Sequence, residues 1–315
     1  MQSCPGMLGR IVLDRYRVEQ ELGEGAMGRV YRARHVRVGR TVAIKVLHPH
    51  MLREPGAAVR FEREARLAAR LHHPSVAAVV DFDDGIMVME HAPGRPLVDV
   101  IGAPMPRERA IAIVRQLLVG LDHAHAMGLV HRDLKPENIM IDDADRTCIV
   151  DWGIAVLREG SDDETRRLTT QGLVLGTPMY MAPEQAKDEV VDHRCDLFAL
   201  GVIAYELLAG AAPFEGTGLD VIVANVTQDP PSIATRTGVD VDPVLEAFVR
   251  RLMAREVANR FASAHDALLE LDRIAAAPVA VPATEDITTT VRFQRPQPRR
   301  SGGKLVAAAV GWRER

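Results

Sequence analysis

The sequence predicts an α+β fold with two lobes, a small one built mainly of strands and a larger one built mainly of helices. Strands on either side of a glycine-rich turn occupy residues 16–33, a proline and glycine break follows at 91–96, and helical patterns dominate from residue 107. A chain of 315 residues also exceeds the size at which one core usually stops growing. We therefore expect one large two-lobed domain or two domains.

Composition and charge favour a soluble cytoplasmic protein. The formal net charge of −4 is too small to favour nucleic acid as a partner. Three cysteines, Cys4, Cys148 and Cys195, lack the spacing of metal sites, which fits a reducing compartment. The sequence does not open on a signal-peptide pattern, and the late apolar run from Leu305 to Trp312 is far shorter than the roughly 20 residues that span a bilayer. We expect no transmembrane segment.

The first strands enclose a glycine-rich turn. Residues 1–13 carry little pattern and are expected to be a loose lead-in, after which a strand begins at Tyr16. The turn reads Gly23-Glu-Gly25-Ala-Met-Gly28, and glycine lets backbone amides approach phosphate oxygens without an intervening Cβ. This GxGxxG pattern alone is weak and also occurs in plain hairpins. A dinucleotide-binding fingerprint would open a helix, whereas Val30 continues a strand.

The next strand and helix each carry a charged residue of interest. Lys45 lies in the apolar strand 41–47, where an isolated lysine is ordinarily just exposed. The helix is expected at residues 61–71. On it, Glu62 and Glu64 both fit ordinary solvated positions, and they point to different sides of the helix. The helix also has an apolar stripe, formed by Phe61, Ala65, Ala68 and Leu71.

The second half of the sequence is mainly helical. Two strands near 76–82 and 86–90 precede the break, which we predict to be the linker between the lobes. Helices are expected at residues 107–127, 194–209, 219–228, 243–254 and 263–275. After residue 275 the composition turns to alanine, proline and threonine and then becomes basic, without periodicity. This tail is expected to be disordered, with at most a weak contact to anionic membrane surfaces.

Two short motifs contain the residue types that phosphoryl transfer requires. Residues 131–138 read His-Arg-Asp-Leu-Lys-Pro-Glu-Asn, and Asp151-Trp-Gly follows thirteen residues after Asn138. Phosphoryl transfer needs one carboxylate to accept a hydroxyl proton, divalent ions between phosphate oxygens and fixed positive charge. Asp133, Lys135, Asn138 and Asp151 supply residue types suited to these roles.

In this order and spacing, the motifs resemble the signature set of protein kinases, specifically the eukaryotic-like (Hanks-type) bacterial serine/threonine class. The resemblance implies the bilobal protein kinase fold, with one key helix in the small lobe. It further implies ATP and Mg²⁺ as cofactors, with Mn²⁺ as an alternative metal, and protein serine and threonine hydroxyls as acceptors, including those of a second copy of the chain. The boundaries that follow are a kinase domain at 14–275, an N-lobe at 14–90, a hinge at 90–96, a C-lobe at 97–275 and a tail at 276–315.

The same resemblance implies roles for individual residues. Asp133 would be the catalytic base, Lys135 would add charge near the transferred group, and Lys45 would hold the α- and β-phosphates while pairing with Glu64. Lysine at position 135 also favours serine and threonine over tyrosine as acceptors. Asn138 and Asp151 would bind the metal. The nucleotide would contact Leu22, Gly23, Glu24, Gly25, Ala26, Met27, Gly28, Val30, Ala43, Lys45, Met89, Glu90, Ala92 and Met140.

Residues 151–184 correspond to an activation segment. Autophosphorylation is expected at Thr169 or Thr170, with the Arg132 guanidinium pairing with the phosphate. Thr177 resembles the threonine that contacts the catalytic aspartate and helps to hold the substrate. Three further positions resemble architectural residues of the family: Asp196, which would anchor the catalytic loop, and Glu184 and Arg260, which would form an ion pair.

One position departs from the family pattern. Trp152 replaces the phenylalanine of the Asp-Phe-Gly motif, and tight cores resist added volume. Ala68 is small enough to leave room for the larger ring.

Two alternatives to a protein kinase remain open. One is a pseudokinase that binds nucleotide or partners without transfer, against which the full set of charged residues argues. The other is a small-molecule kinase of related fold, against which the Gly176-Thr-Pro and Ala182-Pro-Glu motifs argue, because they resemble a peptide-docking platform.

Overall fold

The protein is represented by a computed structural model, which describes residues 7–25, 28–51, 57–83, 85–152, 178–187 and 189–277. The chain divides into two compact units, Met1–Pro278 and Val279–Arg315, and every described residue lies in the first. The expected tail beyond residue 277 therefore lies outside the described residues. So do five residues with expected site roles, namely Ala26, Met27, Thr169, Thr170 and Thr177.

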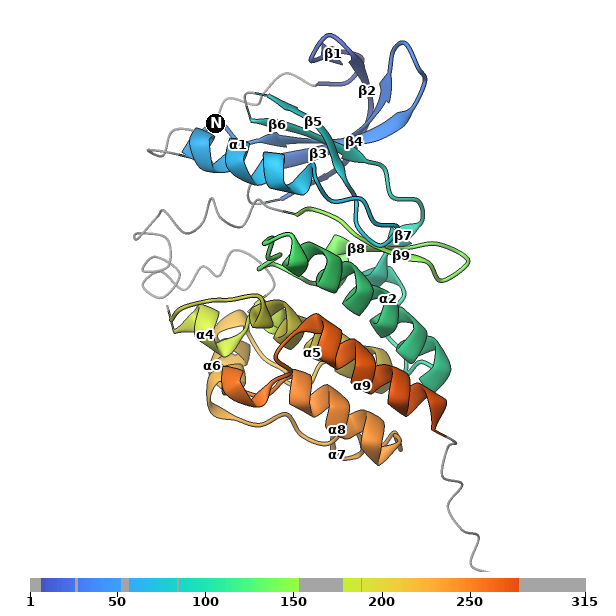
Figure 1. Cartoon of the computed structure of the whole chain (residues 1–315), viewed down its shortest axis with the longest axis vertical. Helices are drawn as coiled ribbons and strands as arrows, with labels where there is room; N and C mark the ends of the chain where they lie inside the picture. The colour runs from blue at the N-terminus through green and yellow to red at the C-terminus, as the bar shows by residue number, and fades with distance from the viewer. Residues whose placement is uncertain are drawn as a thin grey trace, which may run out of the picture. The chain divides into compact units, whose positions relative to one another are not determined.

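An antiparallel sheet forms the first part of the described chain (Figure 1). Its strand order is β1-β2-β3-β4-β6-β5, and each neighbouring pair is antiparallel. The strands are β1 (Ile11–Val12), β2 (Tyr16–Glu24), β3 (Gly28–His35), β4 (Thr41–Leu47), β5 (Val79–Asp83) and β6 (Ile86–Glu90). The strands expected from period-2 patterns are thus confirmed.

The sheet begins earlier in the chain than we predicted. β1 pairs with β2, and the backbone N–H of Gly9 donates to the carbonyl of Val18 at 2.9 Å. Val12 is buried beneath this edge. The expectation of a loose lead-in is therefore wrong for residues 7–13, because a two-residue strand is too short to show a period of two in the sequence.

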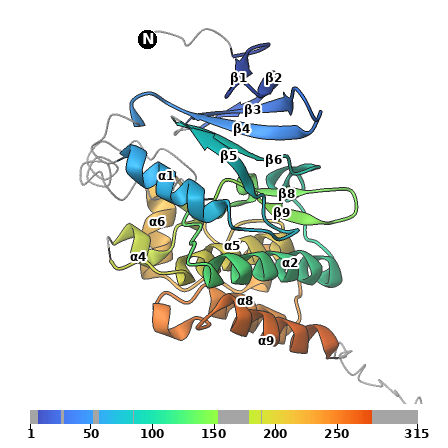
Figure 2. The ribbon, with the colours of Figure 1, turned by 45° about the horizontal axis from the view of Figure 1, so that its top comes forward.

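Helix α1 (Ala57–Ala68) runs beside this sheet (Figures 1 and 2). Its expected apolar stripe is confirmed, since Phe61, Ala65 and Ala68 are all buried. Glu62 is exposed and forms an ion pair with Arg66 at 2.6 Å, one turn further along. It is therefore an ordinary solvated helix charge, worth a few tenths of a kcal/mol, about 0.3–0.5.

The second part of the chain is helical, apart from a small sheet β7-β8-β9 that lies between the larger sheet and helix α2 (Figure 2). The strands are β7 (Arg95–Pro96), β8 (Ile139–Ile141) and β9 (Thr147–Ile149). The α-helices are α2 (Arg107–Ala126), α4 (Pro183–Ala186), α5 (Arg194–Ala209), α6 (Gly218–Thr227), α7 (Ile233–Thr237), α8 (Pro243–Leu252) and α9 (Ala264–Ala276). Short 3-10 turns are η2 (Leu97–Asp99), η3 (Pro136–Asn138), η5 (Pro178–Tyr180) and η6 (Val257–Asn259).

Helix α5 is the centre of this helical part. Nearly all of its residues are buried, and α2 and α8 pack against it. The five helices expected from the sequence are confirmed, with ends shifted by no more than one or two residues. The two that were missed, α4 and α7, have four and five residues, too few to show a helical period.

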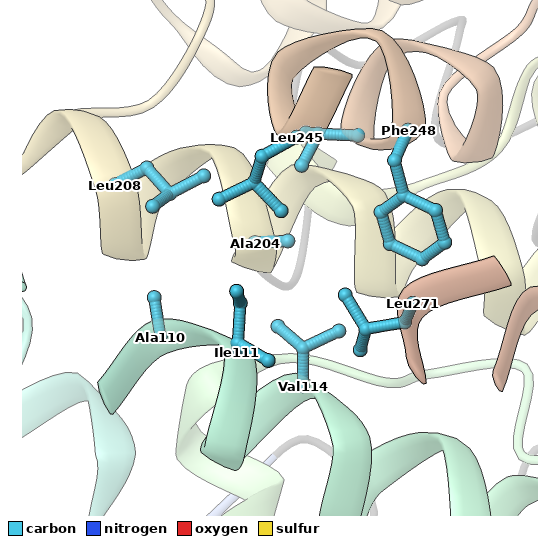
Figure 3. Close-up of a pocket in the computed structure, with 9 residues that line it drawn as sticks. Ala110, Ile111, Val114, Ala204, Leu208, Leu245, Phe248 and Leu271 are labelled. Carbon is cyan, nitrogen blue, oxygen red and sulfur yellow. The ribbon is translucent and has the colours of Figure 1, made fainter. Parts of the chain in front are cut away.

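A small void lies where α2, α5, α8 and α9 meet (Figure 3). Its volume is about 10 Å³, close to that of a single water molecule, and its walls are apolar side chains such as Ile111, Ala204 and Leu271. A cavity of this size without polar partners stays dry. It is therefore a packing gap in the core of the helical part.

Two histidine rings stack between the segment that follows α1 and helix α2. The rings of His73 and His123 are stacked with centroids 5.4 Å apart, and Nδ1 of His73 accepts a hydrogen bond from the backbone of Ser75 at 3.1 Å. Burial, followed by the charge of His123, lowers the pKa of His73 below its usual value of 6.5. The unfolded chain therefore takes up this proton at a higher pH than the folded chain does.

This difference predicts an acid-dependent loss of stability. Because the folded pKa is depressed, the stability that neutral His73 supports is present above about pH 6.5 and is lost as the pH falls through the folded value. His73→Asn keeps an acceptor for the Ser75 amide but does not titrate. Urea unfolding at several values between about pH 7 and pH 5 should show a smaller loss of unfolding free energy for the variant than for the wild type. Equal losses in the two proteins would contradict the assignment.

Candidate active site

Four of the residues expected to hold a nucleotide share one face of the larger sheet. Val30 lies directly opposite Lys45, and Ala43 lies directly opposite Met89. Directly opposed residues project to the same face, as do residues two apart on one strand such as Ala43 and Lys45. Lys45 is only 5% exposed although it is charged. The face therefore combines apolar surface with one buried cation.

The glycine-rich turn lies beside this face. Its glycines differ in the space around the position that a Cβ would take. The backbone N–H of Gly25 donates to the carbonyl of Gly28 at 2.8 Å. A Cβ on Gly28 would come within 2.2 Å of the Val46 carbonyl, so this position needs glycine for strand packing. A Cβ on Gly23 would meet nothing within 4 Å. The absence of a side chain at Gly23 thus leaves free space, which fits the close approach of a ligand.

The remaining expected nucleotide residues lie around the same region. Leu22 and Glu24 are exposed on β2, and Glu24 forms an ion pair with Arg29 at 3.0 Å. Glu90 ends β6 and donates its backbone N–H to Ala78 at 2.9 Å, and Ala92 lies half-buried in the segment that follows.

Met140 forms part of the small sheet, where it pairs with Cys148. Burial, and then the charge of Glu90, raises the pKa of the Cys148 thiol to about 12. Since the thiolate is the reactive form, the raised pKa leaves Cys148 as an unreactive thiol at neutral pH.

Lys45 and Asp151 meet across the two parts of the domain. Nζ of Lys45 lies 2.7 Å from each carboxylate oxygen of Asp151, although the residues are 106 positions apart. Burial would raise the pKa of Asp151, but the charge and hydrogen bonds of Lys45 outweigh this and lower it. Asp151 is therefore an anion at neutral pH.

This contact corrects one expectation. Among the described residues, the only ion pair of Lys45 is with Asp151, so the expected pair with Glu64 is not formed. A buried ammonium requires an opposite charge in contact. Both carboxylate oxygens of Asp151 contact the Lys45 ammonium group. The backbone of Asp151 is left-handed, with φ +67°. Glu64 is itself buried on α1 and takes part in contacts of its own.

The loop between α2 and β8 gathers three more expected residues. Nζ of Lys135 lies 2.8 Å from Oδ2 of Asp133, and the amide nitrogen of Asn138 donates to the Asp133 carbonyl at 2.8 Å. The Asp133 side chain is 39% exposed, so it remains accessible to an incoming group. The Val150 N–H donates to the Asn138 carbonyl at 2.9 Å, which brings the loop next to Asp151. The acid, the cation and the amide therefore occupy one site.

Asp196 on α5 anchors the start of this loop. Its two carboxylate oxygens accept the backbone N–H groups of His131 and Arg132, each at 2.8 Å. Nε2 of His125 lies 2.8 Å from Asp196 as well. Burial would raise the pKa of Asp196, but the hydrogen bond and charge of His125 help to lower it. His125 was not among the site residues expected from the sequence, where it is marked by its place one helical turn after the apolar Leu121.

Glu184 and Arg260 form the expected ion pair. Nη1 and Nη2 of Arg260 lie 2.6 and 2.7 Å from the two oxygens of Glu184, and both side chains are almost fully buried. Arg260 also donates to the carbonyls of Ala254 and Arg194. This two-point geometry fixes the short helix α4 against the region before α9.

Trp152 is accommodated in the core despite its size. It is 1% exposed, its Nε1–H donates to the Ile149 carbonyl at 3.0 Å, and its ring meets that of His131 edge-on with centroids 4.9 Å apart. The indole therefore gains a hydrogen bond that phenylalanine cannot make. Ala68 lies in the same core cluster, so the proposal that it leaves room for the ring stays a prediction.

The donor set fits a hard divalent cation. Asn138 and Asp151 offer amide and carboxylate oxygens, which Mg²⁺ and Mn²⁺ prefer. Both Asp151 oxygens contact Lys45 in this structure, so a metal ion could bind them only once Lys45 pairs with another anion, such as a phosphate.

The sheet face around Lys45 and the loop around Asp133 meet at Asp151, as the resemblance to protein kinases implies, and comparisons with known proteins agree. Residues 16–270 match the family model "Protein kinase domain". The chain therefore belongs to the protein kinase family, which confirms the fold class expected from the sequence.

Similar proteins include bacterial serine/threonine kinases, as the sequence resemblance implied. The chain is 38% identical to serine/threonine-protein kinase pkn3 of Myxococcus xanthus over 85% of its own length, and 35% identical to PknB of Mycolicibacterium smegmatis over 92%. It spans only 51% and 48% of those relatives. The PknI kinase domain of Mycobacterium tuberculosis is 30% identical, with a TM-score of 0.67, over 86% of this chain and all of that one. Within the described part of the chain, no helix has the length and apolar character that membrane crossing requires.

Proposed function

We propose that the chain transfers the γ-phosphate of ATP to serine and threonine hydroxyls of proteins. The observation that carries this proposal is the contact of Lys45 with Asp151, with Nζ 2.7 Å from both oxygens. It joins the sheet face suited to a nucleotide to the loop that holds Asp133 and Asn138. Had these residues lined separate surfaces, the motifs would have had no common site.

Each side chain has a defined task in this proposal. The acceptor hydroxyl oxygen bonds to the γ-phosphorus as the bond from that phosphorus to the β-bridging oxygen breaks, and Asp133 takes the hydroxyl proton. Lys135 places positive charge beside Asp133, and Lys45, which now contacts Asp151, would contact phosphate oxygens once nucleotide binds. Asn138 and Asp151 would hold Mg²⁺, with Mn²⁺ as a substitute. The metal supplies charge neutralisation on the phosphates.

Similar proteins support the nucleotide and the acceptor class. A crystal structure of Rad53 in complex with AMP-PNP, an ATP analogue, has a TM-score of 0.63 to this chain at 25% identity. Bacterial relatives that are 38% and 35% identical to this chain are named serine/threonine kinases. The presence of five charged or amide residues also argues against a pseudokinase: Lys45, Glu64, Asp133, Asn138 and Asp151.

Radiolabel transfer tests this function and its rival. The wild-type chain is incubated with Mg²⁺, γ-labelled ATP, a mixed protein acceptor and a pool of hydroxylated metabolites. We expect label in protein as phosphoserine and phosphothreonine, and none when EDTA removes the metal. Label confined to metabolites would support a small-molecule kinase, and ATP binding without any transfer would support a pseudokinase.

We further propose that the chain phosphorylates itself at Thr169 or Thr170, two residues outside the described part. The basis is their place in the activation segment and the position of Arg132, whose guanidinium belongs to the catalytic loop. A second copy of the chain would be a transient partner. Mass spectrometry after incubation with Mg²⁺ and ATP should find this peptide phosphorylated, and the Asp133→Asn protein should leave it unmodified. An unmodified peptide in the wild type would remove the proposal.

A further inference from the structure

Gln185, one residue after Glu184 on helix α4, bridges two segments. Its Oε1 accepts the backbone N–H of Ala182 at 3.1 Å, which caps the helix. Its Nε2 donates to the carbonyl of Arg132 at 2.8 Å. The side chain thus connects the end of the activation segment to the residue before the expected catalytic base.

The orientation of this amide follows from its partners. Ala182 offers only an N–H at this point and needs an acceptor, whereas the Arg132 carbonyl needs a donor. A flipped amide would place oxygen against oxygen and nitrogen against N–H, so only one orientation satisfies both contacts.

The carbonyl that Gln185 holds belongs to an unusual backbone. Arg132 has φ +63°, a left-handed conformation that non-glycine residues rarely adopt and that surrounding structure must maintain. Asp196 holds its N–H at 2.8 Å from one side. Gln185 holds its carbonyl from the other, so both peptide groups around Arg132 have a fixed side-chain partner.

Two sets of contacts hold the segment that carries Gln185. Its neighbour Glu184 is locked by Arg260 at 2.6 and 2.7 Å. The amide nitrogen of Asn225 on α6 donates to the carbonyls of Met179 and Met181, at 3.2 and 3.3 Å, just before α4 begins. A side chain on such a rigid support can impose its geometry on the loop.

We propose that Gln185 is a positioning residue that fixes the Arg132 carbonyl and thereby aligns the Asp133 carboxylate for transfer. The peptide group whose carbonyl Gln185 holds is the one that joins Arg132 to Asp133, so rotating that group would turn the carboxylate. This inference rests on the proposed function for its effect on rate. Its effect on the loop itself does not require that function.

Three variants test the role. Gln185→Glu keeps an oxygen for the Ala182 N–H but replaces the donor to Arg132 by an acceptor, and Gln185→Met removes both contacts without adding charge. Lys187→Met, at the exposed end of the same helix, is the matched control. For both Gln185 variants we expect kcat to fall by roughly 10- to 100-fold, with the KM for ATP within about twofold of wild type. The control should keep the wild-type rate.

A second measurement separates this inference from the function. Hydrogen exchange followed by mass spectrometry should show faster exchange around residues 131–134 in Gln185→Glu than in Lys187→Met, whether or not phosphate is transferred. Nucleotide titration should give the same stoichiometry for all variants, which excludes partial unfolding as the cause of a low rate. Wild-type exchange in Gln185→Glu would overturn the inference, as would a rate loss seen with glutamate but not with methionine, because charge would then be the cause. If the wild type transfers no phosphate, the proposed function fails while the exchange result still decides the contact.

Discussion

Replacing Asp133 with asparagine is expected to lower kcat for phosphate transfer by about 10²- to 10⁴-fold. The asparagine amide cannot accept the hydroxyl proton, and it loses the charge that Lys135 now contacts at 2.8 Å. Nucleotide affinity should change little, because the proposed nucleotide contacts lie on the sheet face around Val30 and Lys45. Initial rates with γ-labelled ATP, together with calorimetric titration of nucleotide, measure the two effects separately.

Asp143→Asn is the matched control for this experiment. Asp143 is exposed in the turn between β8 and β9, away from the loop contacts, and the change in charge is the same. Its rate should equal that of the wild type. An Asp133→Asn protein that kept more than about a tenth of the wild-type rate would contradict the assignment of Asp133 as the base.

Replacing Arg260 with methionine is expected to lower the free energy of unfolding by about 3–5 kcal/mol. Glu184 is 2% exposed and would lose Arg260, whose guanidinium contacts both its oxygens. The carbonyls of Ala254 and Arg194 would also lose a donor. Urea unfolding followed by circular dichroism measures the change.

Two further variants serve as comparisons for the loss of stability in Arg260→Met. Arg115→Met breaks a pair with Asp272 in which both side chains are about half exposed, so it should cost no more than about 1 kcal/mol. The double variant Glu184→Gln with Arg260→Met should be more stable than Arg260→Met alone, because no uncompensated charge then stays buried. A loss for Arg260→Met as small as that for Arg115→Met would mean that the buried pair is not needed.

Local patterns in the sequence predicted much of the fold. Helix α5 spans residues 194–209 as expected, because an apolar run of that length has few alternatives to a buried helix. The residues at 133, 135 and 138 are close in sequence, so their grouping followed from one loop. Strand β1 could not be predicted because two residues carry no period.

Contacts between distant segments were harder to predict. The ion-pair partner of Lys45 is Asp151 and not Glu64, and composition and spacing do not show which of two distant carboxylates the folded chain brings to this lysine. His125 and Gln185 are ordinary polar residues in the sequence. They gain roles only because folding brings them to the buried Asp196 and to the Arg132 carbonyl.

In the proposed function, four residues surround one metal-bound triphosphate: Lys45, Asp133, Asn138 and Asp151. A crystal structure of the chain with Mg²⁺ and a non-hydrolysable ATP analogue tests it most directly. We expect the adenine between Val30 and Met140, the metal on Asn138 and Asp151, and the Lys45 ammonium on phosphate oxygens. Triphosphate density elsewhere, or beside Lys45 but out of reach of Asp151, would rule out this arrangement.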